Sequence, residues 1–124
     1  MSIPSAPPGW PTVIPRIVAT DAARLVKFIH DVFGATGQYE EQRPTEVWIG
    51  SSVLLISEAG IRDAMPAFLY VYVHDVDGAY HRAVGAGATT LEAPSLMPYG
   101  DRRCMVEDAW GNTWQIAAYR GAGA

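Results

Sequence analysis

The feature that most constrains this chain is an internal repeat of one strand, one helix and three strands. The segment Val18–Asp21, before one helical run, resembles Val73–Asp75 before another, at an offset of about 54 residues. Gly34–Thr36 after the first run returns as Gly87–Thr89 after the second. We therefore expect an α+β fold of two repeated βαβββ modules that form a curved sheet around a central crease. Such a crease is a natural place for a ligand.

Hydrophobic spacing and turn residues predict the elements of each module. Apolar residues at helical spacing predict a helix from Ala22 to Phe33, capped by Thr20 or Asp21 and ended by Gly34. A second helix is expected between the cap Asp75 and Gly85. The expected strands are 12–19, 37–42, 46–49, 53–57, 68–73, 88–91, 102–107 and 113–119.

Length and composition indicate one domain. With 124 residues, of which 49% are hydrophobic, the chain suits a single domain over 12–119, with modules of about 12–58 and 67–119. Residues 1–11 read as a Pro-rich arm and 120–124 as a flexible tail. The net charge is −4 and no basic stripe is present, so nucleic acid is not an expected partner. A lone cysteine and the lack of a long apolar run favour a cytoplasmic protein with no membrane contact.

Several motifs resemble one known family. The run from Asp21 to Ala35 is similar to its first module, and Val73–Asp77 followed by Gly85–Ala88 is similar to its second. Tyr99–Arg102 followed by Glu107–Trp114 resembles the ending of its PhnB-like branch. The family is the vicinal-oxygen-chelate (VOC) superfamily of glyoxalases, bleomycin-resistance proteins and extradiol dioxygenases. The resemblance covers residues 12–119 and implies a homodimer with a small-molecule site in the crease. The bleomycin-resistance relatives exchange N-terminal arms between subunits; the resemblance leaves open whether this chain does the same, and Trp10 in the arm is the candidate for docking on a partner.

The resemblance also implies where a metal would bind. Metal-dependent members carry one His, Glu or Gln ligand on each of four strands. The matching positions in this chain are Ile14, Leu54, Phe68 and Gln115. Three of them are hydrocarbon side chains, which have no donor atom for a divalent ion. The expectation is therefore no metal site and no cofactor, with non-standard metal ligands kept as an alternative.

Strand periodicity predicts the residues that line the crease. If Phe68 faces inward, Tyr70 and Tyr72 do so as well. One of Arg102 and Arg103 must face inward, either to hold a ligand carboxylate or phosphate or to form an ion pair with Glu107 or Asp101. The expected ligand-binding residues are Ile14, Arg16, Leu54, Ile56, Phe68, Tyr70, Tyr72, Arg103 and Gln115.

These residues favour binding of a small, largely aromatic or apolar organic molecule without metal. A VOC-family enzyme of lyase, isomerase or dioxygenase type is the alternative, and a module with a filled core is the third hypothesis. No catalytic residue is assigned. Asp101 and Asp108 are expected to be turn residues, and Cys104 a small core residue.

Overall fold

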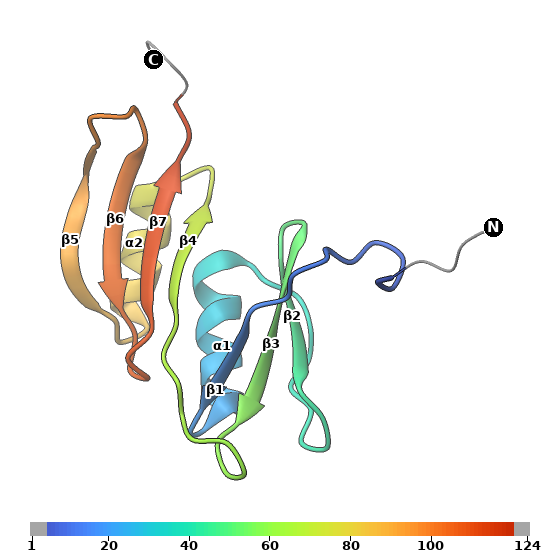
Figure 1. Cartoon of the computed structure of the whole chain (residues 1–124). Coiled ribbons are helices and arrows are strands. Elements are labelled where there is room, and N and C mark those ends of the chain that lie inside the picture. The colour runs from blue at the N-terminus through green and yellow to red at the C-terminus, as the bar shows by residue number, and fades with distance from the viewer. Residues whose placement is uncertain (1–4, 121–124) are drawn as a thin grey trace. The chain divides into compact units, whose positions relative to one another are not determined.

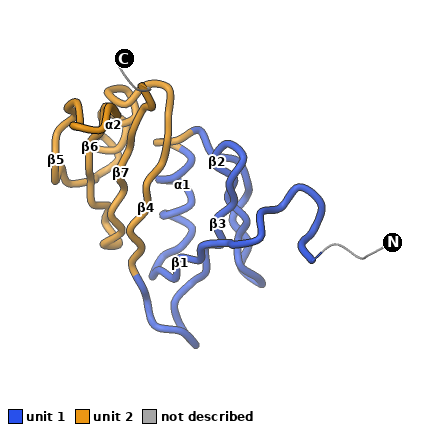
Figure 2. Tube along the Cα trace, turned by 45° about the horizontal axis from the view of Figure 1, so that its top comes forward, with its two compact units in different colours: residues 1–30, 34–65 blue, residues 31–33, 66–124 orange. Residues whose placement is uncertain are grey.

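A computed structural model describes residues 5–120 and divides them into two compact units, coloured separately in Figure 2. The described part of unit 1 is residues 5–30 and 34–65, and that of unit 2 is 31–33 and 66–120. The fold is α+β, with one sheet and one helix in each βαβ-type half, as the repeat predicts. The expectations for residues 1–4 of the arm and 121–124 of the tail lie outside the described residues. No helix within 5–120 is both long and apolar enough to cross a membrane.

Unit 1 is built on a three-stranded sheet with the strand order β1-β3-β2 (Figure 1). Strand β1 (Arg16–Ala19) runs parallel to β3 (Ser52–Glu58), and β2 (Thr45–Ile49) runs antiparallel to β3. The first strand is shorter than the expected 12–19. Pro15 has no N–H to donate, and only its carbonyl oxygen accepts a bond, from the N–H of Leu55 at 3.0 Å.

Helix α1 (Ala22–Phe33) has the predicted bounds, but its first turn is capped in a different way. Asp21 is the N-cap residue in the left-handed region, with φ of 64°, and its side chain makes no capping hydrogen bond. The carboxylate of Glu58, at the end of β3, accepts the N–H groups of Asp21 and Ala22, both at 2.9 Å. A side chain from a distant strand therefore satisfies the first turn of the helix. Gly34 ends the helix as predicted.

Removing this distant cap should weaken unit 1. Glu58→Ala is expected to lower the free energy of unfolding by about 0.5–2 kcal/mol, because two N–H groups at the helix start lose their acceptor. The measurement is urea unfolding followed by circular dichroism. Glu41→Ala, which removes an exposed glutamate from a loop, is the control. Equal effects of the two substitutions would contradict the capping role.

The strand expected over 37–42 is absent, so this prediction was wrong. Only an isolated bridge is formed, in which Thr36 and Trp48 exchange two N–H to carbonyl bonds of 3.0 Å. Gly37 then adopts a φ of 111°, and a Cβ placed on it would lie 2.0 Å from the carbonyl oxygen of Glu46. The backbones meet too closely, and in a conformation too far from extended, for a paired strand to continue.

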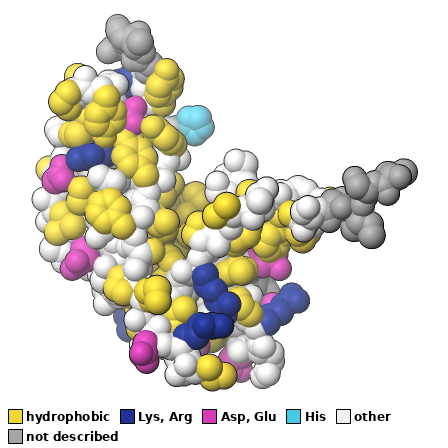
Figure 3. All heavy atoms as spheres, in the orientation of Figure 1, with side chains coloured by type: hydrophobic (Ala, Val, Ile, Leu, Met, Phe, Trp, Pro, Cys, Tyr) yellow, Lys and Arg dark blue, Asp and Glu magenta, His cyan; other side chains and the backbone are white. Residues whose placement is uncertain are grey.

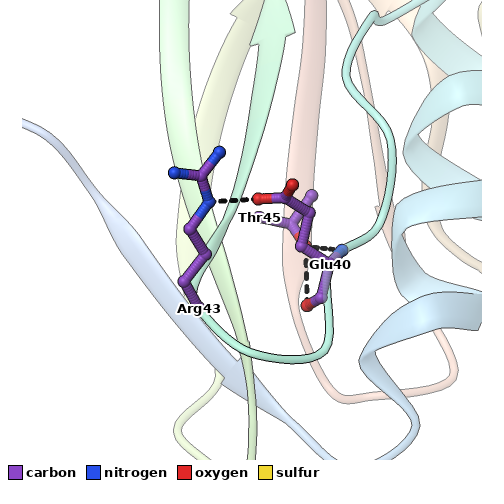
Figure 4. Close-up of polar contacts among 3 residues, drawn as sticks. All are labelled: Glu40, Arg43 and Thr45. Carbon is purple, nitrogen blue, oxygen red and sulfur yellow. Dashed lines mark hydrogen bonds and ion pairs between the residues drawn. The ribbon is translucent and has the colours of Figure 1, made fainter.

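The chain after Gly37 is held instead by side chains, as Figure 4 shows. The N–H of Glu40 donates to the Thr45 hydroxyl at 2.8 Å, which ties the loop to the start of β2. The Glu40 carboxylate pairs with the Nε of Arg43. These contacts explain an ordered loop where the sequence pattern predicts a strand.

Residues 5–15 of the arm form no helix or strand. The N–H of Trp10 donates to the carbonyl of Pro7 at 3.0 Å, and the Trp10 ring meets Trp48 edge-on with a centroid distance of 5.6 Å. Trp10 thus packs against Trp48 of its own chain, and its docking on a partner subunit stays a prediction.

Unit 2 holds a four-stranded sheet with the order β4-β7-β6-β5 and the helix α2 (Val76–Gly85). Its strands are β4 (Phe68–Tyr72), β5 (Thr89–Leu96), β6 (Arg102–Glu107) and β7 (Thr113–Ala118). The side chain of Asp75 caps α2 as predicted by accepting the N–H of Gly78 at 3.0 Å. Strand β5 extends past the expected end at 91, because two register shifts let the strand continue around Pro94.

The core of unit 2 lies on one face of this sheet. Cys104, Trp114 and Ile116 are fully buried there, and Trp114 packs against Phe33 with a centroid distance of 5.2 Å. Burial raises the pKa of the Cys104 thiol to about 11, so the thiol stays protonated at neutral pH. Cys104 is therefore a core residue, as expected.

Candidate functional site

A row of aromatic side chains occupies the open face of the unit 2 sheet. The register pairs Phe68 with Thr113, Tyr70 with Gln115 and Tyr72 with Ala117, so these side chains share one face, as predicted. Helix α2 lies behind the opposite face in Figure 1, and Figure 3 shows rings on the side toward the viewer. The exposed fractions are 66% for Phe68, 38% for Tyr70 and 59% for Tyr72. We call the surface formed by Phe68, Tyr70, Tyr72, Tyr99 and Gln115 the aromatic face.

Asp101 is the polar centre of the aromatic face. Its Oδ2 accepts the hydroxyl of Tyr70 at 2.7 Å and that of Tyr72 at 2.9 Å, and the residue is only 4% exposed. The Tyr70 and Tyr99 hydroxyl oxygens lie 3.2 Å apart. Burial, together with these hydrogen bonds, raises the pKa of Tyr70, and the hydrogen bond to Asp101 raises that of Tyr72. Both phenols therefore keep their protons at neutral pH.

Arg103 points toward the same face, and Arg102 points away from it. The Nη2 of Arg103 donates to Glu92 at 2.8 Å and its Nη1 donates to the Tyr99 hydroxyl at 3.1 Å. Its Nε is buried without a hydrogen-bond partner among residues 5–120. Arg102 pairs with Asp77 at 2.8 Å. The expected ion pair of Arg103 exists, but it is with Glu92, and Arg103 braces Tyr99.

Sequence reasoning missed three members of this network: Glu92, Tyr99 and Asp101. Asp101 was expected to be a turn residue, whereas its carboxylate is buried beneath two phenols. The available signal for Asp101 was its place directly before the strand 102–107, in a module whose strand 68–73 carries the inward Tyr70 and Tyr72. Glu92 was missed because β5 was expected to end at residue 91, directly before it.

A hollow of about 370 Å³ adjoins the aromatic face at Tyr72. The C-terminal ends of β4 and β7 and the residues that follow them form its walls, so a ligand on the aromatic face has room beside Tyr72. The lining residues are Tyr72, Val73, His74, Ala118 and Tyr119.

In unit 1 the expected lining residues do not share a face. Arg16 lies beside Leu55 in the parallel pair β1–β3, so it points away from the side that carries Leu54 and Ile56. Leu54 and Ile56 are 6% and 1% exposed and belong to the core of the unit. The prediction that they line a site together with Arg16 was wrong. Ile14 is half-buried just before β1.

Arg16 lines a different hollow of unit 1, also of about 370 Å³. Its Nε donates to the Ser57 hydroxyl at 3.0 Å, and Arg43 and Arg62 line the same hollow. Figure 3 shows basic side chains gathered over this unit. Glu40, Glu41 and Glu58 balance these three charges.

The four positions that match the metal ligands of the family do not fit a divalent ion. Ile14, Leu54 and Phe68 offer no donor atom, and the amide of Gln115 alone is not a ligand set. Within residues 5–120, no group of three or more His, Cys, Asp and Glu side chains is arranged to hold a metal.

Comparison with known proteins gives one family. The family model described as "Glyoxalase/Bleomycin resistance protein/Dioxygenase superfamily" matches residues 12–116. An uncharacterized protein of Mycobacterium tuberculosis is 28% identical, with 86% of this chain and 73% of that protein covered.

Solved structures share the fold. TioX from a Micromonospora species has a TM-score of 0.72 at 21% identity, with 87% of this chain and 98% of TioX covered. A glyoxalase/bleomycin resistance protein/dioxygenase family enzyme from Burkholderia phytofirmans has a TM-score of 0.74 at 20% identity, with 86% and 97% covered.

Proposed function

This chain belongs to the glyoxalase/bleomycin resistance protein/dioxygenase superfamily, and from that premise we propose that it binds a small organic molecule with an aromatic or apolar body, without the family's usual metal. The aromatic face is the proposed site. The observation that carries the proposal is the row of Phe68, Tyr70 and Tyr72, three neighbouring rings left 38–66% exposed on one sheet face. Exposed rings in a row offer stacking area to a flat ligand.

The network around Asp101 supports binding over acid–base catalysis. General acids and bases work best with a pKa near the operating pH. The pKa values of Tyr70 and Tyr72 are raised, so these phenols stay protonated near neutrality and are not poised as general bases. Each terminal nitrogen of Arg103 donates one hydrogen bond within the face, to Tyr99 or to Glu92. These groups hold the shape of the face, which suits a binding protein.

A neutral aromatic probe tests the proposal. Wild-type protein is expected to bind 2-naphthalenemethanol saturably in a calorimetric titration. Phe68→Ala should weaken binding by about tenfold, since it removes a stacking ring without breaking a hydrogen bond. Val84→Ala, which trims an exposed apolar residue of α2, is the matched control. Unchanged affinity in the Phe68 variant would refute the site.

Metal addition should leave the protein unchanged. We expect no shift of the melting temperature with Ni²⁺, Zn²⁺, Mn²⁺ or Fe²⁺, and no stoichiometric metal in the purified protein. A specific ion present at one hundred times its Kd would add about 2.7 kcal/mol of stability, which is readily measured. One ion per chain together with a clear shift would restore the enzymatic alternative.

Three finer assignments belong to the same proposal: the PhnB-like branch, a cytoplasmic location and a homodimer. The sequence around Tyr99–Arg102 and Glu107–Trp114 supports the branch. The sheet orders leave edge strands in both units, β1 and β2 in one and β4 and β5 in the other. Isolated bridges cover only one residue each on β1 and β2, Val18 with Met65 and Trp48 with Thr36, and edge strands of this kind favour association with a second copy.

A further inference from the structure

Acidic side chains outnumber basic ones on the face that carries the aromatic row. In the strand register Glu107 lies opposite Thr113 and Glu92 lies opposite Met105, so both carboxylates are on the side of Phe68 and Tyr70. Asp101 adds a third carboxylate, buried under the phenols. Arg103 is the one basic residue on this face of the four strands, and Glu92 pairs with it. Three acids against one base leave this face with a net negative charge.

The hydroxyl groups add to this bias. A phenol has one proton to donate, and Tyr70 and Tyr72 both donate theirs to Asp101. The hydroxyl of Tyr99 accepts a bond from Arg103, and because the Tyr70 proton goes to Asp101, Tyr99 is the donor in its 3.2 Å contact with Tyr70. What the tyrosines still present to a ligand is therefore oxygen lone pairs and electron-rich ring faces. Both attract cations and hydrogen-bond donors.

Free donors, which an anion would need, are scarce on the same surface. Each terminal nitrogen of Arg103 already donates one bond, Nη1 to Tyr99 and Nη2 to Glu92; the side chain is only 15% exposed and its Nε is buried. The neutral donors on this face of β7 are the amide of Gln115 beside Tyr70 and the hydroxyl of Thr113 beside Phe68. An anionic ligand would thus meet three carboxylates with little to bind it.

We propose that the aromatic face selects organic cations, namely molecules in which an ammonium or amidinium group is attached to an aromatic or apolar body. This inference rests on the proposed function and adds the charge of the ligand to it. The body stacks on Phe68 and the tyrosine rings, while the cationic group lies near the phenol oxygens above Asp101. Arg103 is a positioning residue that holds Tyr99.

Three probes with one ring system separate charge from stacking: 2-naphthylmethylammonium, 2-naphthalenemethanol and 2-naphthoate. Calorimetric titrations at pH 7 and low salt are expected to rank them in that order, with the ammonium about tenfold tighter than the alcohol. The preference should shrink at 0.5 M NaCl, because salt screens the carboxylates.

Charge-removing variants test the source of the preference. Asp101→Asn is expected to reduce the ratio of ammonium to alcohol affinity to about twofold or less. Asp63→Asn removes an equal charge from an exposed loop of unit 1 and should keep the full ratio. Glu107→Gln, at an exposed position, should lower the ratio partially and serves if the Asp101 variant does not fold.

The outcomes separate the two proposals. If the alcohol binds and the naphthoate binds as tightly as the ammonium or more tightly, the selection of cations is overturned and the proposed function stands. A ratio unchanged in both Asp101→Asn and Glu107→Gln would also overturn it. If none of the three probes binds, the proposed function fails as well.

Discussion

Asp108→Ala is expected to lower the free energy of unfolding by about 3–5 kcal/mol, because buried donors that lose their acceptor cost about 1–3 kcal/mol each. The Oδ2 of Asp108 accepts the Nδ2 of Asn112 at 2.9 Å and the Nε1 of Trp114 at 2.8 Å. Its Oδ1 accepts the N–H groups of Trp110 and Asn112, both at 2.9 Å. Asn112 and Trp114 are fully buried, so water cannot replace the carboxylate.

The effect should reach beyond the β6–β7 turn. The Oδ1 of Asn112 accepts the N–H of Ala67 at 2.8 Å, which ties the turn to the residue before β4. Chemical denaturation of Asp108→Ala, beside Glu107→Ala as the exposed neighbouring acid, measures the difference. Asp108→Asn should also be strongly destabilising, because its amide nitrogen would face two donors. A loss below 1 kcal/mol in the alanine variant would contradict this account.

Gly37→Ala is the second substitution with a large expected effect. A non-glycine residue at φ of 111° is strained by about 1–3 kcal/mol, and its Cβ would lie 2.0 Å from the carbonyl oxygen of Glu46. The neighbouring group is backbone of β2 and cannot rotate away. We expect a total loss of about 2–4 kcal/mol, because the displacement of a packed backbone adds to the strain.

Gly60→Ala provides the matched control. Gly60 has no positive φ, and a Cβ there would meet no atom within 4 Å. This substitution should change the free energy of unfolding by less than about 0.5 kcal/mol. Similar melting temperatures for the two variants would show that the chain around Gly37 adapts more readily than its geometry indicates.

The sequence predicted the helices and most strands, because each follows from local spacing. Helix α1 has both of its expected bounds, and the cap of α2 is the expected Asp75. The strand over 37–42 and the full length of β5 were not predictable in this way. The first depends on how closely Gly37 approaches Glu46, and the second on register shifts around Pro94. Both are properties of strand pairing.

The candidate site, too, was predictable where it follows from alternation along a strand and not where it depends on the pairing between strands. On β4 and β7, alternation places Tyr70 beside Gln115, since the pairing is regular from Phe68 to Tyr72. In unit 1, alternation holds along each strand, but the pairing places Arg16 beside Leu55, one residue away from the position that would put Arg16 on the side of Leu54 and Ile56. A one-residue shift moves every side chain of a strand to the other face. Leu54 therefore lies in the core and Arg16 outside it.

The attachment of Glu58 to the start of α1 has a consequence for the order of folding. The helix supplies no side-chain cap of its own, and its acceptor arrives from a residue 37 positions later in the chain. Closing that loop has an entropic cost that must be met before the bond forms. The first turn of α1 should consequently form with the β1–β3 pair, so its backbone amides would report on assembly of the sheet in hydrogen exchange.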